Sequence, residues 1–525
     1  MRVAKPLAAF LVAALAAAGS APASAQRALV DYENSAKAAE VREAAEWRLA
    51  FRPSLQVLRQ TVTQLRAGQG VAPEAAGRAD AILKMSGFGS EADERKALTE
   101  AATLLLGKAW SPEQQSLEAL ALRSSTPVFG GAHDMVSVEA LYPAQAAAGA
   151  RYRIDLYQSA PTTSATPRKG ALVKTIAAGE LAGGRQSIPM DLSAAPDGAY
   201  LLIAEFSAGP ATGSPSAQSV YLLHDLAARH AALTRALAPI KGHDAAKATA
   251  EYPYVLAEAL QAGTREIVSY DFPKAMARSA EIARDLKAGR DPVRRATGLQ
   301  NRAYRFAEAR ELVPYQLYVP SKWTPDRKWP LVVALHGANL DETNMLGRAG
   351  GEMQKLAEQY GYVVVAPLGY KLNSGYGSLR MPRALLPEDL RRRQLSEADV
   401  LAVSALVERE YAVDPHRRYL TGNSMGGGGT WWIGGKFSER WAAIAPAAYG
   451  GVLPEDVAAL KRVPVMAVVG DRDELGMLDS VRASVATLRA GGAEPRYIEV
   501  KGGTHAGAFD AAMPDVFKFF SEHQR

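Results

Sequence analysis

The chain has 525 residues, enough for two to four domains, and it contains no cysteine. A chain without cysteine excludes disulfides, thiol chemistry, cysteine metal sites and a lipoprotein anchor. The 61 Lys and Arg residues outnumber the 55 Asp and Glu residues by six, and this mild positive charge gives no indication of nucleic-acid binding.

Residues 1–25 resemble a secretory signal peptide. Arg2 and Lys5 supply a positive start, Leu7–Ala18 is an apolar run shorter than a membrane span, and Ala23-Ser24-Ala25 fits a cleavage site. We therefore expect a mature chain that starts near Gln26, has a formal charge of 61 − 2 − 55 = +4, and is secreted or periplasmic. No later stretch is long and apolar enough to predict a membrane span.

Residues 26–125 are predicted to be helical, because apolar residues recur there at spacings of three and four. Pro53 is predicted to kink or restart the first helix. We interpret the apolar stripe as core packing; it comprises Trp47, Phe51, Leu55, Leu58, Val62 and Leu65.

Residues 126–224 change to the alternating pattern of half-buried strands. Six short strands separated by turn residues such as Pro196-Asp197-Gly198 predict a small β-sandwich, of immunoglobulin-like type. The strands are expected around Tyr152–Leu156 and at Val136–Leu141, Leu172–Ile176, Gln186–Leu192, Tyr200–Phe206 and Ser219–Leu223.

Residues 225–291 return to an alanine-rich helical pattern, and we expect these helices to pack with the N-terminal ones. From 292 to 525 strands and helices alternate, which predicts a doubly wound, mostly parallel α/β sheet. One helix is predicted at Glu397–Tyr411, opened by a capping box of Ser396 and Asp399. The strands are predicted at Leu331–Leu335, Val363–Ala366, Tyr419–Thr421, Ala442–Ala445, Val465–Val469 and Arg496–Val500.

The pentapeptide Gly422-Asn423-Ser424-Met425-Gly426 has the pattern G-x-S-x-G. A short β-favouring segment precedes it and a run of small residues follows it, so the local prediction is strand, tight turn, helix. A serine in such a strained turn needs small residues two positions before and after it. We interpret Ser424 as a nucleophile.

A serine hydroxyl needs a base, an orienting acid and an oxyanion hole. In hydrolases with a G-x-S-x-G turn the triad follows the chain order serine, acid, histidine. His336 and His416 precede Ser424 and are therefore excluded, and His523 lies in the charged tail. His505, in a glycine-rich loop after the last predicted strand, is the expected base.

The acid should follow the strand Val465–Val469. Asp471, Asp473 and Glu474 all qualify by position, and the usual Gly-x-x-Asp spacing from Gly470 selects Asp473. Asp471 is the alternative, and its structural role would be an Asx-turn.

The oxyanion is expected to bind two backbone amides. One is that of Met425, and the other is that of Ala338 in the loop His336-Gly337-Ala338-Asn339. Because no histidine–carboxylate cluster has ligand spacing, we expect no metal and no other cofactor.

Residues 298–525 resemble the polyhydroxybutyrate-depolymerase and feruloyl-esterase-like carboxylesterases, and within them secreted proteins described as predicted phospholipases or peptidases. The resemblance covers a little under half of the chain and implies an α/β-hydrolase with Ser424, Asp473 and His505 as its triad and no metal. Some relatives carry an immunoglobulin-like domain ahead of the hydrolase. The segments that carry the resemblance are Val313–Pro320, Pro330–Gly337, Arg418–Gly427, Trp441–Pro446 and Gly503-Thr504-His505.

The sequence departs from these relatives in ways that concern the pocket. Val468-Val469 stands where an aromatic residue and a histidine are common, and four glycines follow Met425. Residues 370–393 are rich in glycine and arginine, which indicates either a basic loop over the pocket or a solvated connection.

These observations predict a hydrolase of carboxylic esters on small molecules or polymers, with no nucleic-acid partner. A serine peptidase of the same fold is the nearest alternative, and a non-catalytic binding or surface protein with a vestigial hydrolase module is the alternative of another class. Residues 26–290 are expected to shape access to the site without supplying chemistry.

Overall fold

The computed structural model describes residues 39–68, 70–85, 87–131, 134–160, 167–183, 185–267, 269–378 and 387–525. The predicted signal peptide and its cleavage site lie outside this range. Within it, none of the helices combines the length and the apolar character that crossing a bilayer requires.

The N-terminal helices are interrupted at Pro53, as predicted. One helix ends at residue 50 and the next begins after Ser54, whose hydroxyl accepts a hydrogen bond from the amide of Val57. Trp47 and Phe51 pack against a neighbouring sheet, which confirms that the apolar stripe is buried as core. The later helices are α3 (Leu55–Arg66), α4 (Pro73–Lys84), α5 (Glu91–Leu105) and α6 (Pro112–Ala119).

Two sheets follow, and their facing side chains share one apolar core. The smaller sheet has the order β1 (Leu120–Ser124), β3 (Asp134–Ala140), β6 (Gln186–Met190). The larger has the order β2 (Val128–Phe129), β9 (Ser216–Leu222), β7 (Gly198–Ala208), β4 (Arg151–Ala160), β5 (Arg168–Glu180), with β8 (Ala211–Thr212) on β7.

All six predicted strands of this region are present, but the prediction of helix up to residue 125 is wrong at its end. Residues 120–124 form β1, antiparallel to β3 with Leu122 opposite Val138. Pairing with a distant strand decided this conformation, because a five-residue segment has no strong preference of its own.

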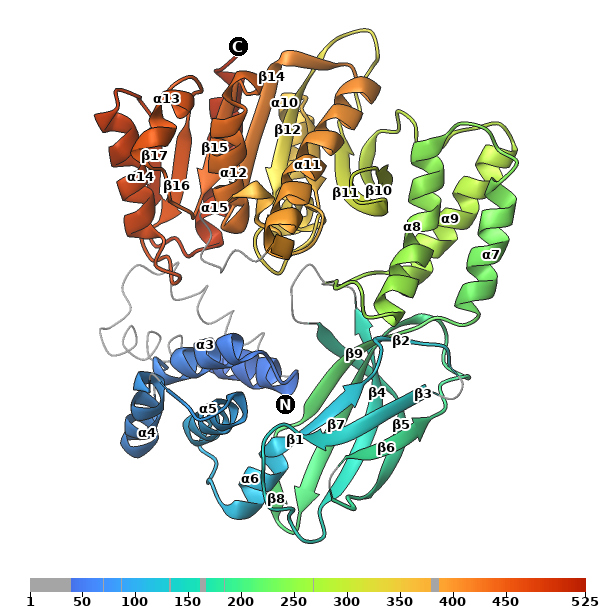
Figure 1. Cartoon of the computed structure of the whole chain (residues 1–525), viewed down its shortest axis with the longest axis vertical. Coiled ribbons are helices and arrows are strands. Elements are labelled where there is room, and N and C mark those ends of the chain that lie inside the picture. The colour runs from blue at the N-terminus through green and yellow to red at the C-terminus, as the bar shows by residue number, and fades with distance from the viewer. Residues whose placement is uncertain are drawn as a thin grey trace, which may run out of the picture.

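The next helices are α7 (Leu226–Leu237), α8 (Asp244–Gln261) and α9 (Phe272–Lys287), and the expectation that they pack with the N-terminal helices is wrong. Their core includes Tyr221 of β9 and Ala303 and Leu312 of the adjoining hairpin. In Figure 1 they stand beside β10 (Gly298–Phe306) and β11 (Glu311–Val319), on the opposite side of the molecule from α3–α5. An alanine-rich apolar face predicts burial without specifying the partner.

The C-terminal part forms an eight-stranded sheet, and its strands from β12 onward are parallel, as predicted. An antiparallel hairpin, β10–β11, extends one edge through β13. The order is β10 (Gly298–Phe306), β11 (Glu311–Val319), β13 (Val363–Pro367), β12 (Trp329–Leu335), β14 (Val413–Asn423), β15 (Ala443–Ala447), β16 (Met466–Gly470), β17 (Arg496–Val500).

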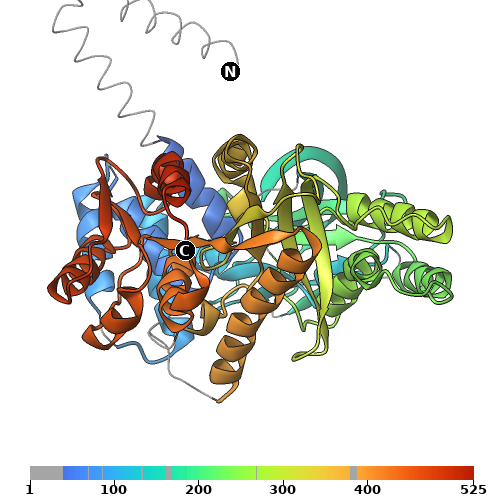
Figure 2. The ribbon, with the colours of Figure 1, turned by 90° about the horizontal axis from the view of Figure 1, so that it is seen from above.

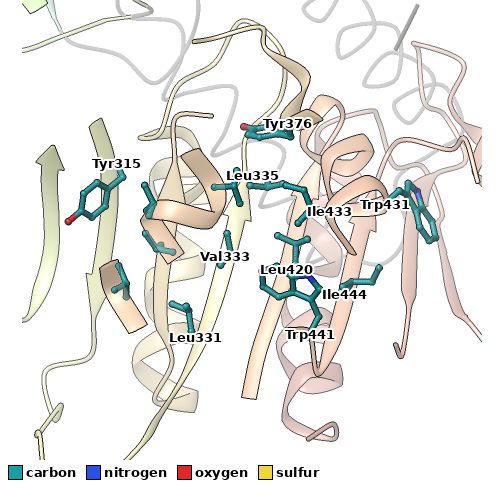
Figure 3. Packing of buried hydrophobic residues seen from close by; sticks show 14 of the residues in the cluster. Tyr315, Leu331, Val333, Leu335, Tyr376, Leu420, Trp431, Ile433, Trp441 and Ile444 are labelled. Carbon is teal, nitrogen blue, oxygen red and sulfur yellow. The ribbon is translucent and has the colours of Figure 1, made fainter. Parts of the chain in front are cut away.

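Helices cover both faces of this sheet (Figure 2). The core on one face includes side chains of α11 (Pro387–Glu410), α12 (Met425–Lys436) and α14 (Leu478–Ala490), and Figure 3 shows part of it. The core on the other face includes side chains of α10 (Asn344–Tyr360) and α15 (Gly507–Ser521). The sheet, covered on both sides, is therefore the rigid element to which the loops at the carboxyl ends of its strands are attached.

The predicted helix start at Ser396 is wrong, because α11 begins at Pro387. Ser396 lies inside the helix, and its hydroxyl accepts a hydrogen bond from the amide of Tyr376. Asp399 is fully buried and accepts hydrogen bonds from the hydroxyl of Tyr304 (2.5 Å) and the amide of Tyr370 (2.8 Å). The residues that resemble a capping box therefore support tertiary contacts.

Candidate active site

Ser424 occupies the sharp turn between β14 and α12, with φ 59° and ψ −121°. This is a strained conformation for a residue with a side chain. A Cβ at Gly422 would lie 2.4 Å from the carbonyl oxygen of Gly426, and a Cβ at Gly426 would lie 2.1 Å from that of Leu335. Both glycines of the pentapeptide are therefore required by close backbone approach, as the sequence predicts.

His505 and Asp473 lie together beyond the carboxyl ends of β16 and β17. The Nδ1 atom of His505 is 2.8 Å from Oδ2 of Asp473, whose side chain is completely buried. The other carboxylate oxygen, Oδ1, accepts hydrogen bonds from the amides of Leu475 (3.0 Å) and Met477 (3.4 Å). This arrangement orients the imidazole and leaves Nε2 as its second functional atom.

The Nε2 atom of His505 is buried, and it has no hydrogen-bond partner within the described residues. In particular, no hydrogen bond joins Nε2 of His505 to Ser424 in the described structure. Catalytic hydrogen bonds are often long before substrate binds. The structure thus brings His505 and Asp473 into contact. Ser424 lies at the same end of the sheet, after β14, which is two strands from β16 and three from β17.

The other two acidic candidates bind backbone amides. Asp471 accepts a hydrogen bond from the amide of Gly502 (2.6 Å), and Glu474 accepts one from the amide of His505 (2.9 Å). Each therefore shapes the loop that carries His505, and only Asp473 reaches the imidazole ring. Asp471 was expected to form an Asx-turn in its structural role, but its carboxylate instead binds the amide of Gly502, 31 residues away.

The loop after β12, residues 336–340, is called the oxyanion loop below. Gly337 lies close to Ser424, because a Cβ there would be 3.5 Å from the serine Cβ. Ala338 is exposed next to it, and Met425 opens α12, where helix amides are not used within the helix. Neither amide donates a hydrogen bond to an acceptor among the described residues.

His336, the first residue of the oxyanion loop, is buried and contacts two backbone carbonyls. Its Nδ1 is 2.8 Å from the carbonyl oxygen of Gly337, and its Nε2 is 2.8 Å from that of Leu368. Burial lowers the pKa of His336, although both carbonyls oppose the shift. The peptide plane that carries the amide of Ala338 is the one whose carbonyl contacts His336.

Residues 369–377, called the support segment below, touch the oxyanion loop at two points. Asn373 and Asn339 form a reciprocal pair: the Asn339 amide donates to Oδ1 of Asn373, and Nδ2 of Asn373 donates to Oδ1 of Asn339, each at 2.8 Å. The hydroxyl of Tyr376 donates to the carbonyl of His336 at 3.3 Å. Sequence reasoning marked this segment as unusual but missed these contacts.

Tyr376 is fully buried and lies beyond Leu335 at the end of β12 (Figure 3). Its ring occupies a slot bordered by glycines, since a Cβ at Gly429 would be 2.7 Å from the ring. A Cβ at Gly369 would be 2.4 Å from it. The glycines after Met425 therefore leave room for a support of the oxyanion loop.

Residues 370–393 were expected to form a basic loop or a solvated connection, and for the described arginines neither expectation holds. Arg391, Arg392 and Arg393 belong to α11. Arg391 donates to the carbonyl of Glu308, Arg392 pairs with Asp389, and Arg393 is buried against the carbonyl of Ser378. Helix formation turned these side chains toward partners. The other arginines, Arg380 and Arg383, lie outside the described residues.

The described residues include no group of three or more histidine and acidic side chains placed to bind a metal. The geometry combines a serine on a strained turn, an imidazole held by a buried carboxylate, and amides beside a helix N-terminus. Such an arrangement suits acyl transfer, in which charge develops on an oxygen near those amides.

Residues 310–519 match the family model Esterase, described as "Putative esterase". A bifunctional acetylxylan esterase/xylanase from Neocallimastix patriciarum is 29% identical over 162 residues, which are 30% of this chain and 21% of that protein. The chain thus matches about a fifth of the length of this curated relative.

Two solved structures show weaker similarity. One is of a thermostable esterase, with TM-score 0.37, 19% identity and coverage of 77% of this chain and 100% of that chain. The other is of a ferulic acid esterase from Anaeromyces mucronatus, with TM-score 0.36, 17% identity and coverage of 42% and 89%. Through residues 310–519, less than half of its length, this chain is thus similar to the esterase family.

Proposed function

We propose that this protein is a serine hydrolase that cleaves carboxylic esters through Ser424, His505 and Asp473. The observation that carries the proposal is the pair of His505 and the buried Asp473, which holds one imidazole nitrogen and leaves the other free at the end of the sheet where Ser424 lies. Asp473 is assigned as the acid because Asp471 and Glu474 bind amides instead.

The proposed reaction has two steps. Ser424 Oγ attacks the acyl carbon while His505 Nε2 takes the hydroxyl proton, and Asp473 stabilises the imidazolium. The amides of Met425 and Ala338 bind the oxyanion of the tetrahedral intermediate. When this collapses, His505 gives the proton to the leaving alcohol; water then attacks the acyl-enzyme with His505 as base and regenerates Ser424.

Further parts of the proposal concern the rest of the chain. We propose export to the periplasm or the medium, on the pattern of residues 1–25, and an immunoglobulin-like character for the sandwich of residues 126–224. The proposed domain limits are 26–125, 126–224, 225–291 and 292–525. Because the curated relative is named for acetylxylan, acetyl esters are the first substrates to test.

The test uses the purified full chain and p-nitrophenyl esters of increasing acyl length, with labelling by a fluorophosphonate probe. We expect wild-type protein to hydrolyse the esters and to be labelled, and Ser424→Ala to lose labelling and at least about 10³-fold in turnover. Faster cleavage of peptide anilides than of esters would favour the peptidase alternative. Wild-type protein that neither turns over esters nor reacts with the probe would indicate a vestigial module.

A further inference from the structure

Arg265 belongs to the connection between α8 and α9, outside the hydrolase sheet, yet its guanidinium is buried against that sheet. Its side chain is 7% exposed. Nη1 donates to the carbonyl of Tyr370 (3.1 Å), and Nη2 donates to the carbonyl of Leu312 (3.0 Å) and to Oε2 of Glu311 (3.2 Å). These contacts join a helical region to the start of the support segment.

Tyr370 is the residue through which this contact continues. Its φ of 71° is uncommon for a residue with a side chain, so its backbone needs fixing by its surroundings. The amide donates to Asp399, the carbonyl accepts from Arg265, and the hydroxyl donates to Glu311 (2.9 Å). Arg265 is the one of these three partners that comes from outside the hydrolase sheet and its helices.

The support segment holds the oxyanion loop on both sides of Ala338. The pair of Asn373 and Asn339 fixes the peptide that follows Ala338. His336 fixes the carbonyl of the peptide that precedes it, and Tyr376 fixes the carbonyl of His336. Because Asn339 has a φ of 59°, the loop adopts a conformation that these contacts must maintain.

We propose that Arg265 is a positioning residue for the oxyanion loop, acting through Tyr370 and the support segment. This inference rests on the proposed function, in which the amide of Ala338 binds the oxyanion. Arg265 touches no reacting atom in this scheme. Its effect arises because an oxyanion donor is effective only when it is held in place before the charge develops.

A planar guanidinium suits this role because it can reach three acceptors at once. A lysine at the same position has a single charged nitrogen at the end of a flexible chain, so it can satisfy fewer of them in the same geometry. A methionine of similar length keeps apolar packing but makes none of these hydrogen bonds. The series arginine, lysine, methionine therefore reduces the number of hydrogen bonds stepwise while a side chain of similar length still fills the site.

The test compares full-length wild type, Arg265→Lys, Arg265→Met and Arg278→Met. Arg278 is the matched control, since it lies on α9 of the same helical region but is exposed and pairs with Glu281 (2.9 Å). Hydrogen–deuterium exchange of peptides covering residues 336–343 and 369–377 measures the loop directly. Ester hydrolysis measures kcat and KM, and thermal unfolding checks that each variant folds.

We expect Arg265→Met to exchange faster in both peptides and to lose at least about tenfold in kcat with KM within about threefold, since one complete oxyanion donor contributes about 10²- to 10³-fold. Arg265→Lys should fall between wild type and Arg265→Met, and Arg278→Met should match wild type. If Arg265→Met does not fold, Arg265→Lys carries the same comparison.

Unchanged exchange in both loops of the Arg265 variants would overturn the proposal, as would faster exchange with wild-type kcat. A uniform loss of stability, with faster exchange throughout the protein, would also overturn it, because Arg265 would then be a general structural contact. Failure of the proposed function is distinguishable: wild-type protein would then be inactive on esters, while the exchange data would still decide whether Arg265 orders the loop.

Discussion

Replacing Asp473 by asparagine tests the assignment of the acid, and the structure dictates which way the new amide must face. Oδ1 of Asp473 accepts two backbone amide hydrogen bonds, from Leu475 and Met477. An asparagine must keep its carbonyl oxygen at the position of Oδ1, so its NH₂ group takes the position of Oδ2, which in the wild type is 2.8 Å from Nδ1 of His505. Nδ1 of His505 must then accept a hydrogen bond from this NH₂ group. The imidazole proton therefore moves to Nε2, and His505 can no longer act as the base.

The wrong tautomer should lower kcat by on the order of 10³- to 10⁴-fold. This corresponds to about 4 to 5.5 kcal/mol in activation free energy. The control is Asp471→Asn, which keeps a carbonyl oxygen for its single contact with the amide of Gly502 and should change kcat by less than about tenfold.

The assay is initial-rate hydrolysis of p-nitrophenyl acetate at fixed pH, with fluorophosphonate labelling as a count of active sites. Thermal unfolding of both variants guards against loss through misfolding. If Asp471→Asn proved the more damaging substitution in folded protein, the assignment of Asp473 and the argument from its amide contacts would both be refuted.

Three further outcomes follow from particular contacts. Gly429→Ala should destabilise the protein by about 1–3 kcal/mol in chemical denaturation, because the new methyl group would lie 2.7 Å from the Tyr376 ring. Gly435→Ala, on the same helix with its nearest neighbour at 3.6 Å, should be neutral or stabilising, and equal losses for the two would contradict this packing. Burial raises the pKa of Asp399 to about 6 from 3.8, so its contribution to stability is present below pH 4 and is lost as pH rises through 6. Asp399→Asn removes that dependence. The unfolding free energy of the variant minus that of wild type should therefore rise by on the order of 3 kcal/mol between pH 4 and 7.5. A difference between the two proteins that does not vary with pH would contradict this prediction. Ester hydrolysis should be unaffected by EDTA, and a large loss restored by one divalent ion would show that a metal takes part.

Residues 26–290 were expected only to shape access to the site, but their contacts also connect them to the hydrolase sheet. All the proposed reacting groups follow residue 330. Arg265 nevertheless reaches the support segment, and α7–α9 share a core with β10 and β11. A chain shortened to 292–525 would expose that core, so substitution at Arg265 tests the connection better than truncation.

The sequence by itself determined the local features whose causes are local. Gly422 stands two residues before Ser424 because a Cβ there would lie 2.4 Å from the carbonyl oxygen of Gly426, within the same turn. The apolar runs of the parallel strands were equally predictable, since a strand buried on both faces must be apolar along its length. The observed limits of β15 and β16 differ from the predicted limits by one or two residues, and those of β17 agree with the prediction.

Tertiary structure decided which side chains meet. Asp471, Asp473 and Glu474 all follow β16, and the Gly-x-x-Asp spacing favoured Asp473. The contact itself depends on the path of the loop beyond β17, which brings the ring of His505 to Asp473. Ser396 and Asp399 fit a capping box, but the neighbouring loop uses them as buried acceptors inside α11. Arg265 carries no local signal of its role, because its partners lie about 45 and 105 residues away and are brought to it only by packing of the helices against the sheet edge.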